Sequence, residues 1–352
     1  MKYIIPILII ALASCKEVYF PELKKNEKAL VVSGLVTNKN KAHAVQLLWS
    51  KSIGAGESSS PVSNANLYIT NECSEKFFLF EKRPGLYYTD SLTFFPVEGD
   101  SYKLHVELDN GDVYESDYQT LLPEISFSGI KGINGKKDFL VGDNNSTLLQ
   151  SFEGIETFLS IPSENSSIPM MRFNVSLIIQ YAYELNGAST STFYCWRRVN
   201  PNLNINITNI KFDVDATDNY QHSICFLPRS RFFWELEYEY ACFIIQIGGY
   251  RLNDESYKFY KQAYDQLEAD NSILDPIAVQ LSSNLRCVSN PEKKVFGFFE
   301  VSSVNNSTYI IRDRSSTEIE FIKPTNFPLY FPSSGCQLDV LPSIWYTKYL
   351  SK

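Results

Sequence analysis

The chain has 352 residues, of which 44% are apolar and 20% charged, so one large or two ordinary folded domains with sizeable cores are predicted. Aromatic residues make up 14%, a share that favours β-rich architectures over helical bundles. The 32 basic and 40 acidic residues give a net charge of −8, which excludes the broad basic surface that a nucleic-acid partner requires.

The N-terminus has the pattern of a secretory signal peptide. Lys2 precedes an apolar run over residues 3–13, which is shorter than the roughly 20 residues that span a bilayer. Ser14-Cys15 closes this run as in a bacterial lipobox, where the cysteine thiol accepts the lipid. We therefore expect residues 1–14 to be removed and Cys15 to be lipidated; the alternative is a plain signal peptide followed by an incidental cysteine.

Residues 15–28 are polar, charged and interrupted by Pro21, which suits a tether between a lipid anchor and a folded domain. Lys16 and Glu17 resemble a shortened form of the signal that sends lipoproteins of Bacteroidota to the outer face of the outer membrane. The predicted location is therefore the outer membrane, with the lipid anchor in the bilayer and the folded part facing the cell exterior.

Short strands separated by turn residues are predicted over residues 29–123. Residues 101–108 alternate between apolar and polar side chains and lead into Asn110-Gly111, the strongest short-range signal of a hairpin. Repeated short strands at this spacing indicate an immunoglobulin-like β-sandwich.

A second β-rich domain with one helix is expected over residues 124–352. Residues 173–181 and 235–240 alternate strictly, as strands with one solvated face do, whereas the Gly/Asn-rich stretch 132–146 is typical of turns.

The helix is predicted over residues 254–269, after Asn253, which can cap it. Apolar side chains recur there at helical spacing, namely Tyr257, Tyr260, Tyr264 and Leu267. We expect this stripe to pack against a sheet; the alternative is a platform for a ligand.

Six cysteines remain once Cys15 is assigned to lipid, and an even number in an exported chain favours disulfides. None lies in a C-x-x-C pair, so no zinc site is predicted. Cys225 and Cys242 flank a predicted hairpin and are the first choice for a cross-strand pair, while a buried free thiol is the alternative for each cysteine. The disulfide candidates are Cys73, Cys195, Cys225, Cys242, Cys287 and Cys336.

No catalytic constellation is predicted. The three histidines, His43, His105 and His222, are interpreted as surface or hydrogen-bonded core residues, and no Gly-x-Ser-x-Gly motif accompanies them. Glu235, Glu237 and Glu239 share one face of a predicted strand, where solvated surface is favoured over a catalytic carboxylate pair.

Residues 213–219 are rich in Asp and Asn, but they lack the central glycine and the final glutamate of a calcium loop. A polar turn is the favoured interpretation. No metal and no cofactor are predicted.

Several segments in a characteristic order carry a family resemblance: residues 30–38, 61–65, 84–87, 99–104, 194–196, 252–264, 284 and 296–299. In this order the chain resembles the domain-of-unknown-function 4249 family of Bacteroidota outer-membrane lipoproteins. The resemblance implies an N-terminal sandwich similar to the carboxypeptidase-regulatory-like domains that precede TonB-dependent transporters, and genes of the family tend to sit beside such transporter genes. It implies no activity for named residues.

The expected function is that of a non-enzymatic accessory lipoprotein of the cell surface, which binds a ligand or is the partner of a TonB-dependent transporter. One alternative is a glycan-degrading enzyme that uses a carboxylate pair, and another is an adhesin or structural surface protein. The identity of the ligand does not follow from the residues.

Overall fold

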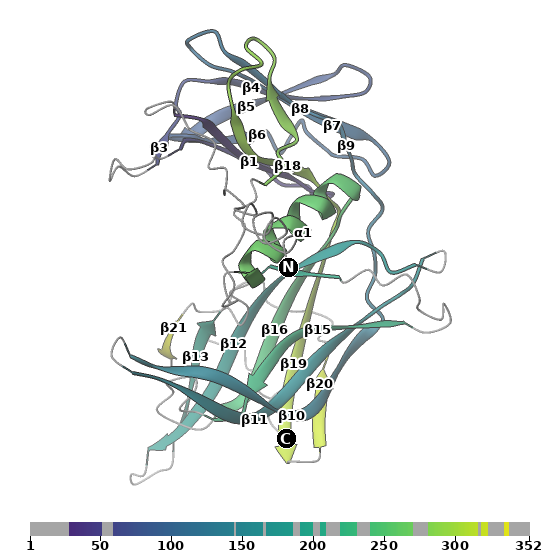
Figure 1. Cartoon of the computed structure of the whole chain (residues 1–352). Helices are drawn as coiled ribbons and strands as arrows, with labels where there is room; N and C mark the ends of the chain where they lie inside the picture. The colour runs from purple at the N-terminus through teal and green to yellow at the C-terminus, as the bar shows by residue number, and fades with distance from the viewer. Residues whose placement is uncertain are drawn as a thin grey trace, which may run out of the picture.

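The computed structural model describes residues 28–50, 59–143, 146–164, 167–185, 191–199, 205–208, 219–230, 240–269, 281–315, 318–322 and 334–337. Within these residues the fold is mainly β with one helix, as the composition predicts, and the strands form three sheets (Figure 1). No helix of this described part is long and apolar enough to cross a membrane. The predicted signal peptide, Cys15 and the tether up to residue 27 lie outside it.

The first sheet curls until its two ends nearly meet, and we call it the curled sheet. Its order is β17-β8-β7-β4-β5-β6-β2-β1-β18, with β3 beside β2 and β9 beside β7. Only the pairing of β1 with β18 is parallel. Its strands are β1 (Leu30–Val36), β2 (Ala44–Trp49), β3 (Ser60–Pro61), β4 (Asn66–Asn71), β5 (Lys76–Arg83), β6 (Leu86–Thr89), β7 (Ser101–Glu107), β8 (Val113–Ser116), β9 (Gln119–Thr120), β17 (Leu285–Cys287) and β18 (Val295–Val301).

This arrangement differs from the expected immunoglobulin-like sandwich over residues 29–123. A sandwich has two separate sheets, whereas the strands here follow one continuous path. The path also takes β17 and β18 from the region expected to form the second domain. The physical reason is the pairing of β18 alongside β1, which places Val295 opposite Leu30 and extends the hydrophobic core inside the curl.

Asn284 joins the two ends of the curled sheet. Its side-chain Nδ2 donates to the carbonyl oxygen of Phe299 at 2.8 Å, and its Oδ1 accepts from the Phe299 backbone N–H at 3.0 Å. The amide thus makes both hydrogen bonds that a neighbouring strand would make with this residue of β18. The side chain of one residue therefore closes the sheet where β17 begins.

Gly297 permits the close approach of β18 to β1. Its φ is +93°, and a Cβ atom at this position would lie 1.9 Å from the carbonyl oxygen of Val32. Only glycine fits such a position, because it has no Cβ and adopts positive φ without strain.

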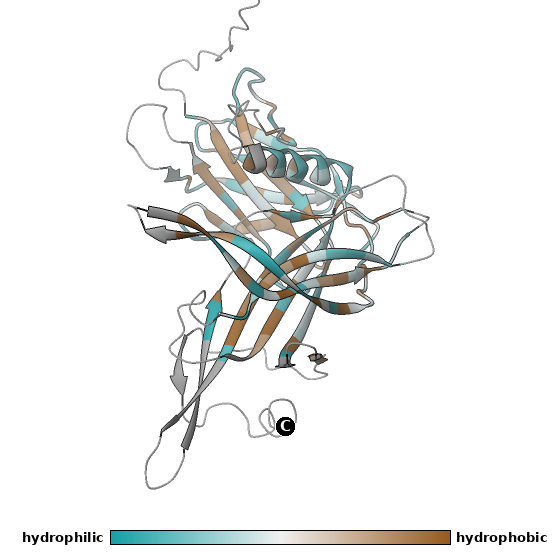
Figure 2. Cartoon of the chain, turned by 60° about the horizontal axis from the view of Figure 1, so that its bottom comes forward, coloured by the Kyte–Doolittle hydropathy of each residue, from teal (hydrophilic) through white to brown (hydrophobic). Residues whose placement is uncertain are grey.

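The second and third sheets pack face to face. The three-stranded sheet has the order β10-β11-β15, and the seven-stranded sheet has the order β20-β19-β16-β12-β13-β21 with β14 beside β12. Their strands are β10 (Gly129–Asp143), β11 (Ser146–Ile161), β12 (Met171–Leu185), β13 (Ser191–Val199), β14 (Asn206–Ile207), β15 (Tyr220–Pro228), β16 (Tyr240–Arg251), β19 (Val304–Ser315), β20 (Glu318–Ile322) and β21 (Ser334–Gln337). Figure 2 shows hydrophobic segments along these strands.

The core between these sheets confirms the predicted alternation over most of residues 173–181. Phe173, Val175, Leu177 and Ile179 are buried against β11, β15 and β16. The side chain of Tyr181 lies outside the described residues, as does the predicted alternation over residues 235–239.

The stretch 132–146 is mostly strand, so the prediction of turns there was wrong. It lies in β10 and the start of β11, which pair in continuous register. Gly132 has a packing role, because a Cβ atom there would lie 2.7 Å from Cγ2 of Ile155 and 2.9 Å from Cζ of Phe321. Glycine in a strand can mark such a close approach as well as a turn.

The predicted helix is present as α1 (Asp254–Ala269). The Asn253 side chain caps it, since its Oδ1 accepts from the backbone N–H of Ser256 at 2.9 Å. The first half of the aromatic stripe is packed: the Tyr257 hydroxyl donates to the Thr208 carbonyl oxygen at 2.8 Å, whereas Leu267 in the last turn is exposed. In Figure 1 the helix lies between the curled sheet and the two lower sheets.

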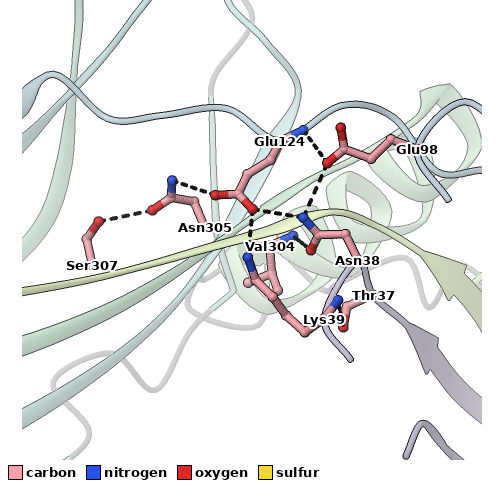
Figure 3. A network of polar contacts seen from close by, with 8 residues as sticks. All are labelled: Thr37, Asn38, Lys39, Glu98, Glu124, Val304, Asn305 and Ser307. Atoms are coloured by element: carbon pink, nitrogen blue, oxygen red, sulfur yellow. Dashed lines mark hydrogen bonds and ion pairs between the residues drawn. The ribbon is translucent and has the colours of Figure 1, made fainter. Parts of the chain in front are cut away.

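Glu124 holds the curled sheet onto the seven-stranded sheet (Figure 3). Its Oε2 accepts hydrogen bonds from Nδ2 of Asn38 at 2.8 Å and from Nζ of Lys39 at 2.7 Å, both just after β1. Its Oε1 accepts from Nδ2 of Asn305 in β19 at 2.9 Å. The Val304 backbone N–H donates to Oδ1 of Asn38 at 3.0 Å. This carboxylate therefore links the end of β1 directly to β19.

Candidate functional site

The structure places the three histidines in two kinds of environment. His43 and His222 are buried. Burial lowers the pKa of His222 to about 4, and burial together with the charge of Lys41 lowers the pKa of His43 to about 4 despite an opposing backbone hydrogen bond. Both are neutral core residues near pH 7. His105 lies instead on the outer face of β7, beside Glu115.

The four cysteines with described side chains are free thiols: Cys73 is exposed, while Cys225, Cys242 and Cys287 are buried. The expected disulfide between Cys225 and Cys242 is therefore absent. Cys225 points toward the core and contacts Oγ1 of Thr157. Cys242 precedes the core residue Phe243, so strand alternation turns it to the opposite face, where its Sγ donates to Oε1 of Gln180 at 3.1 Å.

Burial raises the pKa of both the Cys225 and the Cys242 thiol to about 12. These two side chains are consequently protonated and unreactive near neutral pH. Cys195 and Cys336 lie in β13 and β21, whose backbone is described.

The predicted acidic candidates lie outside the described residues, namely Glu235, Glu237, Glu239 and the acidic residues of 213–218. Within the part of the chain that the structure describes, no three His, Cys, Asp or Glu side chains are grouped closely enough to hold a metal ion.

The buried carboxylate of Glu300 belongs to an ion pair. Its Oε1 accepts from Nε of Arg172 at 3.0 Å, and its Oε2 accepts from the Tyr260 hydroxyl at 2.6 Å. The Arg172 guanidinium also lies over the ring of Tyr250, 3.8 Å from its centroid. Because these residues come from β18, β12, α1 and β16, the cluster joins the curled sheet, the helix and the seven-stranded sheet.

Exposed aromatic side chains gather on the outer side of the curled sheet. Phe78 and Phe80 of β5 are 50% and 58% exposed, on either side of buried Leu79. Phe78 lies opposite Tyr68 of β4, and Phe80 lies opposite Tyr88 of β6. We call these four residues, Tyr68, Phe78, Phe80 and Tyr88, the aromatic face.

Charged side chains border this aromatic face. The ring of His105 stacks on Tyr68 with centroids 4.3 Å apart and an interplanar angle of 14°, and Lys76 Nζ lies 4.3 Å from the Tyr68 centroid. Glu115 accepts from Lys103 Nζ at 3.0 Å and lies 3.1 Å from His105 Nδ1. Tyr68 is therefore held in place by its neighbours, while Phe78 and Phe80 keep half of their surface in solvent.

Glu115 is suited to accept hydrogen bonds. Partial burial favours a higher pKa, but the hydrogen bonds and charges of Lys103 and His105 outweigh it, so the pKa of this carboxyl is lowered. A carboxylate that stays ionised is a poor proton donor near neutral pH. The arrangement offers apolar ring surfaces with fixed charges at their edge, which is the chemistry of a binding surface.

Sequence reasoning missed this aromatic face. Alternation identifies Leu67 and Ile69 as inward residues of β4 and leaves Tyr68 outward. The run from Phe77 to Phe80 has apolar side chains at every position, so its outward residues become evident only from the strand register.

No curated protein matches this chain. The family model of a domain of unknown function, DUF4249, matches residues 16–308. This match covers most of the chain, including the curled sheet, the aromatic face and the helix. The protein therefore belongs to the DUF4249 family.

Proposed function

We propose that this protein is a non-enzymatic accessory lipoprotein of the outer membrane, facing the cell exterior, which uses its aromatic face to bind a TonB-dependent transporter or the ligand that the transporter imports. The exposure of Phe78 and Phe80 carries this proposal. Two adjacent phenylalanines on one sheet face leave apolar surface in water, which is typical of an interaction site.

The N-terminal residues support the anchor and the location. The apolar run before Ser14-Cys15 and the polar tether over residues 15–28 are those of a lipidated chain. Anchored by lipid, the folded part would stay close to the membrane that holds the transporter. This proximity favours a partner in the same membrane, because tethering raises the effective concentration of each protein near the other.

The surroundings of the aromatic face support binding through ring surfaces. Aromatic residues are enriched at protein interfaces, where their large rigid surfaces are buried at little entropic cost. The charges of Lys76, Lys103 and Glu115 lie at the edge of the face, as they do in the polar rim of an interface.

Co-purification from membranes tests this proposal. The full-length lipidated chain carries an affinity tag and is compared with the double variant Phe78→Ser/Phe80→Ser. Phe95→Ser is the matched control, because Phe95 is 52% exposed but lies outside the aromatic face. Equal surface amounts and equal melting temperatures of the three proteins establish that each is folded and exported.

We expect a TonB-dependent transporter, identified by mass spectrometry, to co-purify with the wild type and with Phe95→Ser. Its recovery should fall at least tenfold with the double variant, since two aromatic side chains that become buried on binding contribute more than about 1.4 kcal/mol to the binding free energy. Equal recovery of the transporter with all three proteins would reject binding through the aromatic face. Recovery of no transporter and no small molecule from any of them, even after crosslinking, would reject the function.

A further inference from the structure

The backbone places two cysteines opposite one another at the edge of the seven-stranded sheet. Strands β13 and β21 are antiparallel, and their register pairs Cys195 with Cys336. Directly opposite residues in an antiparallel pair have Cα atoms about 4.5 or 5.5 Å apart. Both separations lie within the range of about 4.4–6.8 Å that a disulfide accepts.

We propose that Cys195 and Cys336 form a disulfide that ties β21 to β13. The other candidates with described side chains are free thiols in separate places: Cys73 is exposed, Cys225 contacts Thr157, Cys242 contacts Gln180, and Cys287 is buried in the core of the curled sheet. Register and the free state of these four thiols together select one pairing from the many that six cysteines allow.

The bond forms by thiol–disulfide exchange with an oxidising disulfide, such as that of a thiol oxidoreductase in the exported compartment. The two cysteine thiols lose two protons and two electrons and gain one S–S bond. The S–S bond of the oxidant breaks, and its two sulfurs leave as thiols. The inference needs export of the chain but not the aromatic face, so it can fail independently of the proposed binding function.

The disulfide has a structural role in this position. β21 has four residues and pairs only with β13 among the described strands, and a short edge strand is held weakly by its backbone hydrogen bonds alone. A covalent bond between residues so far apart in the chain restricts the unfolded state strongly. The disulfide thereby fixes β21 to the seven-stranded sheet.

Peptide mapping of the exported full-length chain tests the pairing. Cells are lysed in N-ethylmaleimide and denaturant, so that free thiols are blocked before they can oxidise, and the protein is digested at acidic pH without reductant. We expect one linked peptide pair containing Cys195 and Cys336 that disappears on reduction, with Cys73, Cys225, Cys242 and Cys287 alkylated. Alkylated Cys195 and Cys336 without reduction, or either of them linked to another cysteine, would overturn the inference.

A pair of variants tests the role of the bond. Dithiothreitol should lower the melting temperature of the wild type to that of Cys336→Ser, and it should leave Cys336→Ser unchanged. Cys73→Ser is the matched control, which should melt and respond to reductant like the wild type because Cys73 is an exposed free thiol. A wild type whose melting is insensitive to reductant would contradict the role. Should Cys336→Ser fail to fold, the peptide map of the wild type still decides the pairing.

Discussion

Replacing Asn284 by alanine tests how the curled sheet is closed. The Asn284 amide makes two hydrogen bonds, at 2.8 and 3.0 Å, to the backbone of Phe299, and both residues are buried. Alanine keeps the backbone of β17 but removes the group that joins it to β18. The perturbation therefore acts on the closure of the sheet without introducing a larger side chain.

The magnitude follows from the two backbone groups that lose their partner. A typical hydrogen bond contributes about 1 kcal/mol net, and a buried polar group left without a partner costs about 1–3 kcal/mol. Water can reach part of the opened seam and replace some of the lost hydrogen bonding. We therefore expect Asn284→Ala to lower the free energy of unfolding by about 2–4 kcal/mol. This would be a large effect for a substitution that removes so few atoms.

Urea unfolding followed by circular dichroism measures this loss. The midpoint should fall while the slope of the free energy with urea stays constant, since the surface exposed on unfolding is almost unchanged. Asn66→Ala is the control, because Asn66 is an exposed residue of the same sheet, and it should change stability by less than about 0.5 kcal/mol. An effect of Asn284→Ala as small as that of the control would refute the closure by this side chain.

Three further predictions concern charged groups. Glu300→Gln leaves the buried Arg172 without a counter-charge and should destabilise the protein by about 3–5 kcal/mol in urea unfolding. Because His43 and His222 have pKa values of about 4 when folded but near 6.5 when unfolded, the unfolded state alone binds their protons between these values. Stability should thus fall as the pH drops from about 6.5 to 4, by up to roughly 3 kcal/mol for each histidine, and His222→Gln should remove about half of this dependence. Glu124→Ala should cost about 1–2 kcal/mol and speed amide hydrogen exchange at the start of β19, whereas unchanged exchange there would contradict its role between the sheets.

Local sequence patterns predicted the strands and the helix better than they predicted which strands lie side by side. Alternation of apolar residues identified β7 and β12, and helical spacing identified α1 with Asn253 as its cap. The pairing of β18 with β1 was not predictable in this way, because these two strands are separated by most of the chain. Periodicity shows which face of a strand is apolar but carries no information about which strand lies beside it.

The aromatic face was not predictable from the sequence for a related reason. Phe77 and Leu79 face the core while Phe78 and Phe80 face solvent, yet the four residues look alike in an apolar run. A shift of register by one residue would exchange the two pairs. Strand alternation does explain why Cys225 and Cys242 do not pair. Phe243 faces the core that contains Cys225, so its neighbour Cys242 faces the opposite side of the sheet.

Site-specific photo-crosslinking on intact cells tests the central claim most directly. A photoreactive phenylalanine analogue replaces Phe78 in the lipidated chain, and the same analogue at Phe95 is the control with matched exposure. The account predicts a covalent adduct from position 78, identified by mass spectrometry as a TonB-dependent transporter or its ligand, and little or none from position 95. Equal adducts from both positions, or none from position 78, would contradict binding through the aromatic face.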